Sequence, residues 1–384
     1  TVHRLQLHYT LSRDSSPALV RNPLIDLLQA VSSQGSISGG ARALGLSYRH
    51  VWGELKRWEL ELGHELLVWE KGQSARLTDF GNKLMWAERQ AQARLAPQIE
   101  ALRSELERSF ALAFDDSVHV LTLYASHDEA ISALREHALH GGGDAAQPDA
   151  SRLHLDVRFT GSVDAIRALN EGRCVMAGFH TLADCARRGH TERSYKPLLQ
   201  PGQHKIIGFA QRTQGLMVAP GNPLQLRTLG DLIATRARFA NRALGSGTRV
   251  ALDELLERQG LQASAIAGYE RSEPSHAAVA QAVASNQCDA GLGIAAAAHQ
   301  AGLDFVPLAQ ERYHLVCLKS ALTQPGVECL LRLLQTSAWQ NQVAAIRGYT
   351  PMQSGQVLSM RKVLPWWDFS QKKPAAAPTI GPCT

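Results

Sequence analysis

Cysteine is sparse in this chain and is not arranged for metal or disulfide chemistry. The six cysteines are scattered and none forms a Cys-x-x-Cys pair, so neither a zinc site nor a disulfide framework is expected. The N-terminus has no apolar signal segment, and no apolar run is long enough to cross a bilayer. These absences predict buried thiols in a reducing compartment and a cytoplasmic protein.

A large excess of charge of one sign is also missing. The formal net charge is +5 over 384 residues, so a nucleic-acid site would have to be a local basic patch. With 45% hydrophobic and 20% charged residues, the composition is that of an ordinary soluble protein and argues against long disorder. The length is too great for one hydrophobic core and predicts about two or three domains.

The segment 36–63 predicts two helices joined by a tight turn. Gly45 stands where a helix often ends in a left-handed residue, and Ser47 can cap the next helix by accepting a bond from an exposed backbone N–H. This arrangement is a helix-turn-helix signature. In the second helix, apolar residues recur with helical spacing and predict one buried stripe of Val51, Leu55, Trp58 and Leu62.

The face beside this stripe predicts contact with DNA. Two cations, two aromatic residues and a glycine fall on it, namely Tyr48, Arg49, Trp52, Gly53 and Lys56. Arginine can pair with a guanine edge in the major groove, and a glycine permits close approach. An ordinary helical hairpin with a solvated basic face is the alternative.

Two short strands around a glycine turn, at 66–70 and 75–77, predict a wing, and Thr78 can cap the helix that follows. The run ARALGLSYRHVWGELKRWELELGHELLVWEKGQSARLTDFG resembles the winged helix of the molybdate-responsive transcription regulators and, more distantly, that of the LysR-type regulators. The resemblance covers residues 22–81 and leaves 1–21 as an N-terminal extension. It implies DNA contacts from Ser47, Tyr48, Arg49, His50, Trp52, Lys56 and Arg57 on the helix, and from Gly72, Gln73 and Arg76 on the wing.

A long helical pattern over residues 82–112 resembles a heptad seam, because its apolar residues are spaced by threes and fours. We expect this linker to join copies into a homodimer or homotetramer, since two-fold DNA sites usually require two heads. Packing on its own domain alone is the alternative. Pro97 interrupts the pattern and predicts a kink or two helices in series, because a proline inside a helix costs about 3 kcal/mol.

From 113 to 367 strand and helix patterns alternate and predict an α/β domain with a mostly parallel sheet. We expect two lobes, one of about 118–209 with 310–364 and the other of about 212–308. Ser126 to Glu129 predict a capping box that opens a helix. Trp366 and Trp367 are expected to pack the last element on this domain, and 368–384 to form a disordered tail.

The run from Gly245 to Thr248 leads directly into a predicted helix. Backbone N–H groups, two hydroxyls and the positive end of the helix dipole form a candidate anion site there. No acid lies between Asp231 and Asp253, whereas that stretch holds Arg236, Arg238, Arg242 and Arg249. An oxyanion or carboxylate would be attracted to them. A simple helix cap with solvated arginines is the alternative.

Four segments, NRALGSGTR, the run from Ser275-His276, DAGLG and LDFVPLAQERYHLV, resemble the periplasmic-binding-protein-like domain found fused to regulators and to molybdopterin biosynthesis proteins. The likeness covers about 118–365. It implies a ligand held in the cleft by helix N-termini of both lobes. The implied effector residues are Ser126, His127, Gly161, Ser162, Arg242, Ser246, Gly247, Thr248, Arg249, Ser275, His276 and Tyr313.

Together these domains predict a one-component transcription regulator that binds operator DNA and a small anionic effector, with no catalytic residues, metal or cofactor. The molybdenum link of both resemblances implies molybdate or tungstate, and formate or another small carboxylate is the competitor. The controlled genes would then serve molybdate uptake or a molybdoenzyme such as formate dehydrogenase. A solute-binding protein would need an export signal, and a molybdopterin-metabolism enzyme would need an acid-base pair or metal cluster; the sequence offers neither.

Overall fold

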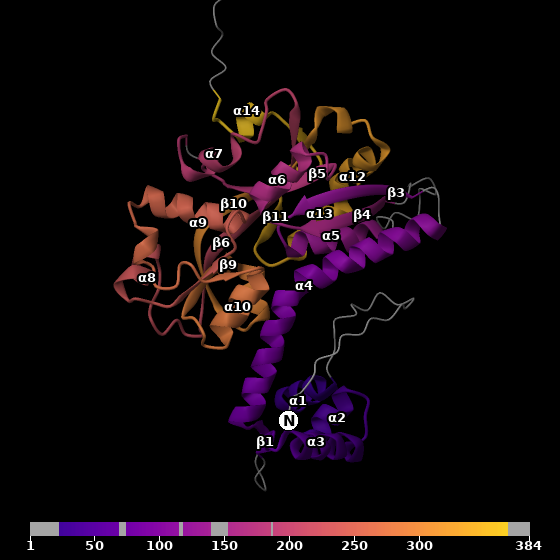
Figure 1. Cartoon of the computed structure of the whole chain (residues 1–384), viewed down its shortest axis with the longest axis vertical. Coiled ribbons are helices and arrows are strands. Elements are labelled where there is room, and N and C mark those ends of the chain that lie inside the picture. Colours follow the sequence, from indigo (N-terminus) through magenta and orange to yellow (C-terminus); the bar gives the residue numbers. More distant parts are fainter. Residues whose placement is uncertain (1–22, 69–73, 115–117, 140–152, 186, 368–384) are drawn as a thin grey trace, which may run out of the picture.

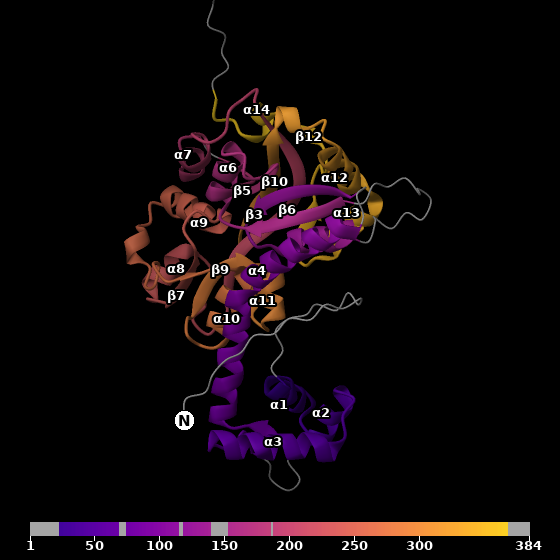
Figure 2. The same ribbon diagram turned by 45° about the vertical axis from the view of Figure 1, so that its right-hand side comes forward.

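A long helix joins a small helical head to a larger α/β body (Figure 1). The computed structural model describes residues 23–68, 74–114, 118–139, 153–185 and 187–367. The head and the body lie at opposite ends of this helix in both views (Figures 1 and 2). Within the described ranges, no helix is both long and apolar enough to span a bilayer.

The head is the predicted winged helix-turn-helix. Its helices are α1 (Pro23–Gln34), α2 (Ile37–Ala43) and α3 (Tyr48–Leu62), and its wing strands β1 (Leu67–Val68) and β2 (Arg76–Leu77) pair antiparallel. Ser47 caps α3 by accepting from His50 N at 3.2 Å, and Gly45 adopts the left-handed φ of 66° that the turn requires. Val51 and Leu55 are buried in the head core, with Trp58 and Leu62 partly buried against it. The predicted stripe is confirmed.

The linker is one continuous helix, α4 (Asp79–Phe114), with Pro97 inside it. Thr78 caps it as predicted, since its Oγ1 accepts from Gly81 N at 3.0 Å. Of the two outcomes expected from Pro97, the structure shows a bend and not a break: the helix changes direction between its lower and upper halves in both views (Figures 1 and 2).

Lobe I comprises β3 (His119–Ala125), α5 (Glu129–Leu139), β4 (Leu153–Phe159), α6 (Ser162–Asn170), β5 (Met176–Leu182) and α7 (His190–Tyr195). Its C-terminal elements are α12 (Pro325–Gln335), α13 (Ser337–Ala345), β11 (Tyr349–Pro351), β12 (Val357–Leu358) and α14 (Met360–Val363). Trp366 is buried against them, as predicted.

Lobe II comprises α8 (Leu229–Ala234), β7 (Phe239–Arg242), α9 (Gly247–Arg258), β8 (Ser272–Glu273), α10 (His276–Ala284), β9 (Ala290–Ile294) and α11 (Ala295–Gln300). Two long strands, β6 (His204–Val218) and β10 (Asp304–Leu318), run through both lobes and pair with each other. The lobes therefore share one sheet, whose main path is β4-β3-β5-β10-β6-β9-β7-β8.

The expectation of a mostly parallel sheet is only partly right. Pairing is parallel toward the outside of each lobe, as in β3 with β4 and β7 with β9, but β10 is antiparallel to both β5 and β6. The centre of the sheet is antiparallel because one strand leaves lobe I and the other returns to it. β10 thus crosses back to lobe I, as the sequence predicted.

The predicted capping box at Ser126 is wrong. Helix α5 begins at Glu129, and the Asp128 carboxylate accepts from Ala130 N at 2.8 Å, so the cap lies two residues later. The Ser126 hydroxyl is left to face Ser162. A run of polar residues offers several caps, and tertiary contacts select one of them.

Candidate functional site

The first candidate site is the outer face of α3, which lies at the far end of the head from the α/β body (Figure 2). Ser47, Tyr48, Arg49, His50, Trp52, Lys56 and Arg57 are all exposed there. Tyr48 and Trp52 are 46% and 40% exposed, which is unusual for aromatic side chains beside a core. An exposed patch of cations and aromatic groups on a helix can enter a DNA major groove.

The cations of this face differ in how they are held. Lys56 and Arg57 form ion pairs along the helix with Glu59 and Glu54, each at 2.6 Å. Arg49 forms no ion pair with any residue that the structure describes. Exposed ion pairs contribute only about 0.2–1 kcal/mol, so phosphate can compete for the two paired cations.

On the wing, Arg76 lies exposed on β2. The other predicted wing residues, Gly72 and Gln73, lie outside the described residues.

The second candidate site is the contact between the lobes, where glycines allow a loop of lobe I to touch a loop of lobe II. Val163 N in lobe I donates to Gly245 O in lobe II at 3.1 Å. A Cβ atom on Gly247 would lie 2.6 Å from His180 Nδ1, and one on Gly161 would lie 2.8 Å from the Gly245 carbonyl. The predicted cleft is therefore closed at this point, and side chains at these glycines would hold the lobes apart.

Buried polar side chains from both lobes meet beside these glycines. On lobe I, Ser126 Oγ lies 3.4 Å from Ser162 Oγ, which lies 3.3 Å from His180 Nδ1. The His180 ring packs on Tyr313 with 3.8 Å between centroids. On lobe II, Thr248 Oγ1 lies 3.4 Å from His276 Nε2. We call these side chains, together with Arg242, the interlobe cluster.

Arg242 is the cation of the interlobe cluster. It is 3% exposed, and its Nη2 donates to Pro274 O at 3.1 Å. Its Nε and Nη1 have no hydrogen-bond partner among the described residues. Burial, and then the positive charge of Arg212, lower the pKa of Arg242 to about 10, so the guanidinium remains protonated at neutral pH.

The histidines of the cluster are neutral. Burial lowers the pKa of His180 and of His276 well below the usual range, and the nearby arginines lower it further. His180 Nε2, His276 Nδ1 and Tyr313 Oη also lack partners within the described part of the chain. Neutral polar groups around one buried cation can hold an anion without competing for its charge.

A second buried arginine is already neutralised. Arg212 on β6 donates from Nε to Glu311 Oε2 at 2.7 Å and from Nη1 to Asp128, and Gln214 Nε2 bonds the same Glu311 oxygen at 2.8 Å. These residues were not predicted from the sequence. The only signal was a polar residue inside an apolar strand, which is also typical of an exposed position.

The structure brings most of the predicted effector residues together, but the side chains of four of them contact other groups. The Arg249 guanidinium lies 4.0 Å from the Tyr269 ring centroid and 3.4 Å from Asp253. Ser275 Oγ donates to Ala93 O on α4, and His127 Nε2 pairs with Glu100 at 3.2 Å. Ser246 Oγ caps α9 by accepting from Arg249 N at 3.3 Å. Of the two predicted arginines, Arg242 belongs to the interlobe cluster, whereas the Arg249 guanidinium contacts Tyr269 and Asp253.

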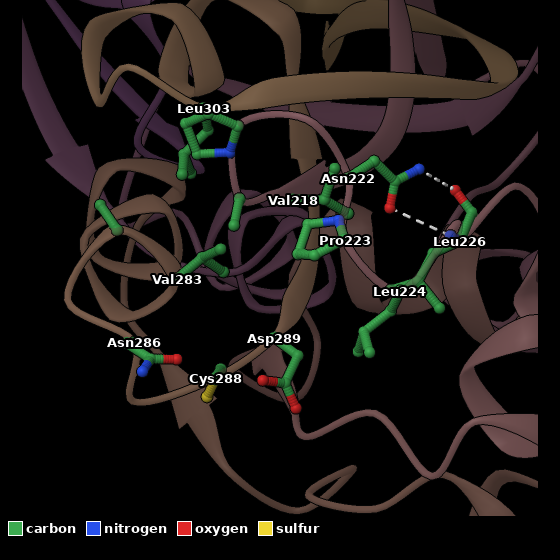
Figure 3. A pocket seen from close by; sticks show the side chains of 13 residues that line it. Val218, Asn222, Pro223, Leu224, Leu226, Val283, Asn286, Cys288, Asp289 and Leu303 are labelled. Carbon is green, nitrogen blue, oxygen red and sulfur yellow. Dashed lines mark hydrogen bonds between the residues drawn. The ribbon is translucent and has the colours of Figure 1, made fainter.

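A separate hollow on lobe II is mostly apolar (Figure 3). Its lining includes Val218, Leu224, Val283 and Leu303, with Asn222 bonded to the Leu226 backbone. None of the predicted effector residues, all of which the structure describes, lines it. Its chemistry does not match that of an anion site.

Two protein families match this chain, one over its α/β body and one over its head. Residues 143–335 match the PBP superfamily domain, and residues 24–82 match the bacterial regulatory helix-turn-helix protein, lysR family. The chain belongs to the PBP superfamily and carries the head of LysR-type regulators.

Similar proteins extend the comparison. The uncharacterized protein YvgK of Bacillus subtilis is 30% identical over 201 residues, which are 52% of this chain and 64% of YvgK. An uncharacterized protein in the ferredoxin 2Fe-2S gene 5′ region of Clostridium pasteurianum is 30% identical over 111 residues, 29% of this chain and 98% of that protein. A Corynebacterium glutamicum OxyR C206 mutant structure covers 86% of this chain and 95% of its own, at 16% identity and a TM-score of 0.39.

Proposed function

We propose that the protein is a one-component transcription regulator in which α3 and the wing bind operator DNA and the interlobe cluster binds a small anion. The observation that carries the effector half is Arg242, a cation buried between the lobes, two of whose nitrogens have no hydrogen-bond partner among the residues that the structure describes. Asp128 and Glu311 attract Arg242 from a distance, whereas a bound anion would accept hydrogen bonds directly from its buried nitrogens. Arg212, with two carboxylates, has no such need.

The charge and the hydrogen-bond donors of the cluster define the ligand class. One available guanidinium and several neutral donors suit a small anion that accepts many hydrogen bonds. Molybdate or tungstate offers four oxygens to these donors, whereas formate offers two oxygens and a single charge that Arg242 alone balances. Given the molybdenum link of the sequence resemblances, we propose control of molybdate uptake or of a molybdoenzyme such as formate dehydrogenase.

The same proposal includes a homodimer or homotetramer joined by α4. Leu102 and Leu106 lie on α4 one turn apart and are 56% and 36% exposed, which leaves an apolar stripe for a second copy. Two heads could then bind the two half-sites of an operator with two-fold symmetry.

Calorimetry with molybdate, tungstate and formate, with sulfate as the general anion control, tests the effector half. Arg242→Gln should abolish binding of the preferred anion, whereas Arg249→Gln, seven residues away, should retain most of it. Equal affinity in wild type and Arg242→Gln would remove Arg242 from the site and with it this proposal. A mobility shift with the DNA upstream of the protein's own gene tests the other half.

A further inference from the structure

The linker helix α4 is fastened to both lobes, on opposite sides of Pro97. On the N-terminal side, Arg94 donates to both oxygens of Glu273 in lobe II, from Nε at 2.8 Å and from Nη2 at 2.7 Å. On the C-terminal side, Ser104 Oγ donates to Leu155 O at 3.1 Å and accepts from Val157 N at 2.9 Å in lobe I. One helix is therefore attached to both lobes, and an effector bound between the lobes would change their separation.

Pro97 makes part of this attachment possible. A proline has no N–H, so the carbonyl of Ala93, four residues earlier, loses its helical partner. Ser275 Oγ donates to this Ala93 oxygen at 3.0 Å and also accepts from Ala278 N at 3.0 Å, capping α10. The Ser275 hydroxyl of lobe II thus supplies the hydrogen bond that the Ala93 carbonyl lacks within α4.

The attachment points are next to the interlobe cluster in sequence. Ser275 precedes His276, and Glu273 precedes Pro274, whose carbonyl accepts from Arg242. In lobe I, His127 follows Ser126 and pairs with Glu100 on α4, whose other oxygen accepts from Ser132 at 2.8 Å. In each lobe, the loop that faces the other lobe also holds α4.

We propose that α4 transmits the separation of the two lobes to the head, through the Arg94–Glu273 attachment and the bend at Pro97. This inference rests on the proposed function. If the lobes separate, the attachments on either side of Pro97 move apart. The helix must then change its bend at the position with no backbone hydrogen bond, or release Glu273. Either change reorients the DNA-binding head, because the head continues directly from the N-terminal end of α4.

Arg94→Gln tests this attachment, because the Arg94 side chain is 49% exposed; since Glu273 is only 1% exposed, Arg94→Gln/Glu273→Gln is measured beside it as the variant that leaves no buried charge without its cation. The matched control is Lys83→Gln, an exposed cation on the same helix. In small-angle scattering of the full chain without added anion, Arg94→Gln should change the maximum dimension and Lys83→Gln should not. An unchanged profile in Arg94→Gln overturns the inference, whatever ligand the cluster binds.

The second measurement separates this inference from the proposed function. In DNase footprints with and without the anion selected by calorimetry, Arg94→Gln should keep the anion affinity and lose the anion-induced change in protection. A wild-type response that persists in Arg94→Gln, or a loss of anion affinity together with the response, counts against the coupling. Failure of the wild type to bind any tested anion counts against the proposed function alone, since the scattering result does not depend on it.

Discussion

Arg212 and Glu311 are direct cross-strand partners at the place where β6 and β10 pass between the lobes, joined by a 2.7 Å bond from Nε to Oε2. Both side chains are buried, and the Arg212 guanidinium also meets Asp128. This group ties the loop before α5 to both crossing strands. The single cation faces two carboxylates, which also accept from Tyr349 Oη and Gln214 Nε2, so the Arg212 charge is neutralised inside the group and the group stabilises the link between the lobes.

Removing Arg212 should therefore destabilise the protein strongly. Arg212→Met leaves two buried carboxylates without their cation, which we expect to cost about 3–5 kcal/mol in the free energy of unfolding. Urea denaturation measures this loss in the free energy of unfolding. Arg238→Met removes an exposed pair with Asp289 and should cost no more than about 1 kcal/mol. Similar losses in the two variants would contradict the buried group's importance.

Arg49 should contribute to DNA affinity more than its neighbours do. It is exposed on α3 and pairs with no acidic group in the described part of the chain, so Arg49→Ala should weaken specific binding by about 1–3 kcal/mol. Mobility shifts on the upstream DNA at fixed salt measure the change. Arg332→Ala, an exposed arginine on α12, is the control. Wild-type affinity in Arg49→Ala would place the recognition surface elsewhere.

The closed arrangement of the lobes should depend on the missing side chain of Gly247. An added Cβ would meet His180 at 2.6 Å, so Gly247→Ala must push the lobes apart or displace that ring. Such overpacking typically costs about 1–3 kcal/mol, and we expect anion affinity in calorimetry to fall accordingly. Gly230→Ala is the control, because its nearest contact would be an ordinary 3.5 Å. Unchanged affinity would show that the anion does not require this contact.

Acid should destabilise the body through its buried histidines. Burial lowers the pKa of His314 to about 3 from its ordinary 6.5, so the unfolded chain binds a proton before the folded chain does. Stability therefore falls as pH drops from 6.5 toward 3, by about 1.4 kcal/mol per pH unit for such a group. Denaturation at several pH values measures the slope, which His314→Leu should reduce. A slope as steep as in the wild type would mean that His314 does not titrate in this way.

Local signals in the sequence predicted the head well and the site less well. Ser47 and Gly45 act on backbone groups a few residues away, so their roles can be inferred from spacing alone. The choice between Arg242 and Arg249 depends on which side of the β7–α9 turn faces lobe I, and that is set by distant packing. The partner of the Ala93 carbonyl lies 182 residues along the chain, so no local pattern indicates it.

In the sheet, too, the features that depend on local sequence were predicted and those that depend on distant contacts were not. Strand and helix alternation identified most elements of the body, because period and burial are local properties. The antiparallel centre follows from β6 leaving one lobe and β10 returning to it, which depends on the path of the whole chain. The position of the α5 cap was also decided by a remote residue, since Arg212 holds Asp128 in place.

The path of β6 and β10 also bears on how this body can be re-engineered. All of lobe II lies between Arg212 and Glu311, and these two residues sit opposite each other in the sheet. Lobe II is thus a continuous insertion whose two ends are already adjacent. A chimaera that takes residues 213–310 from a relative and keeps both junction residues would exchange the lobe II side of the proposed anion site while preserving strand register, so the specificity of that site would be transferable as a single block of sequence.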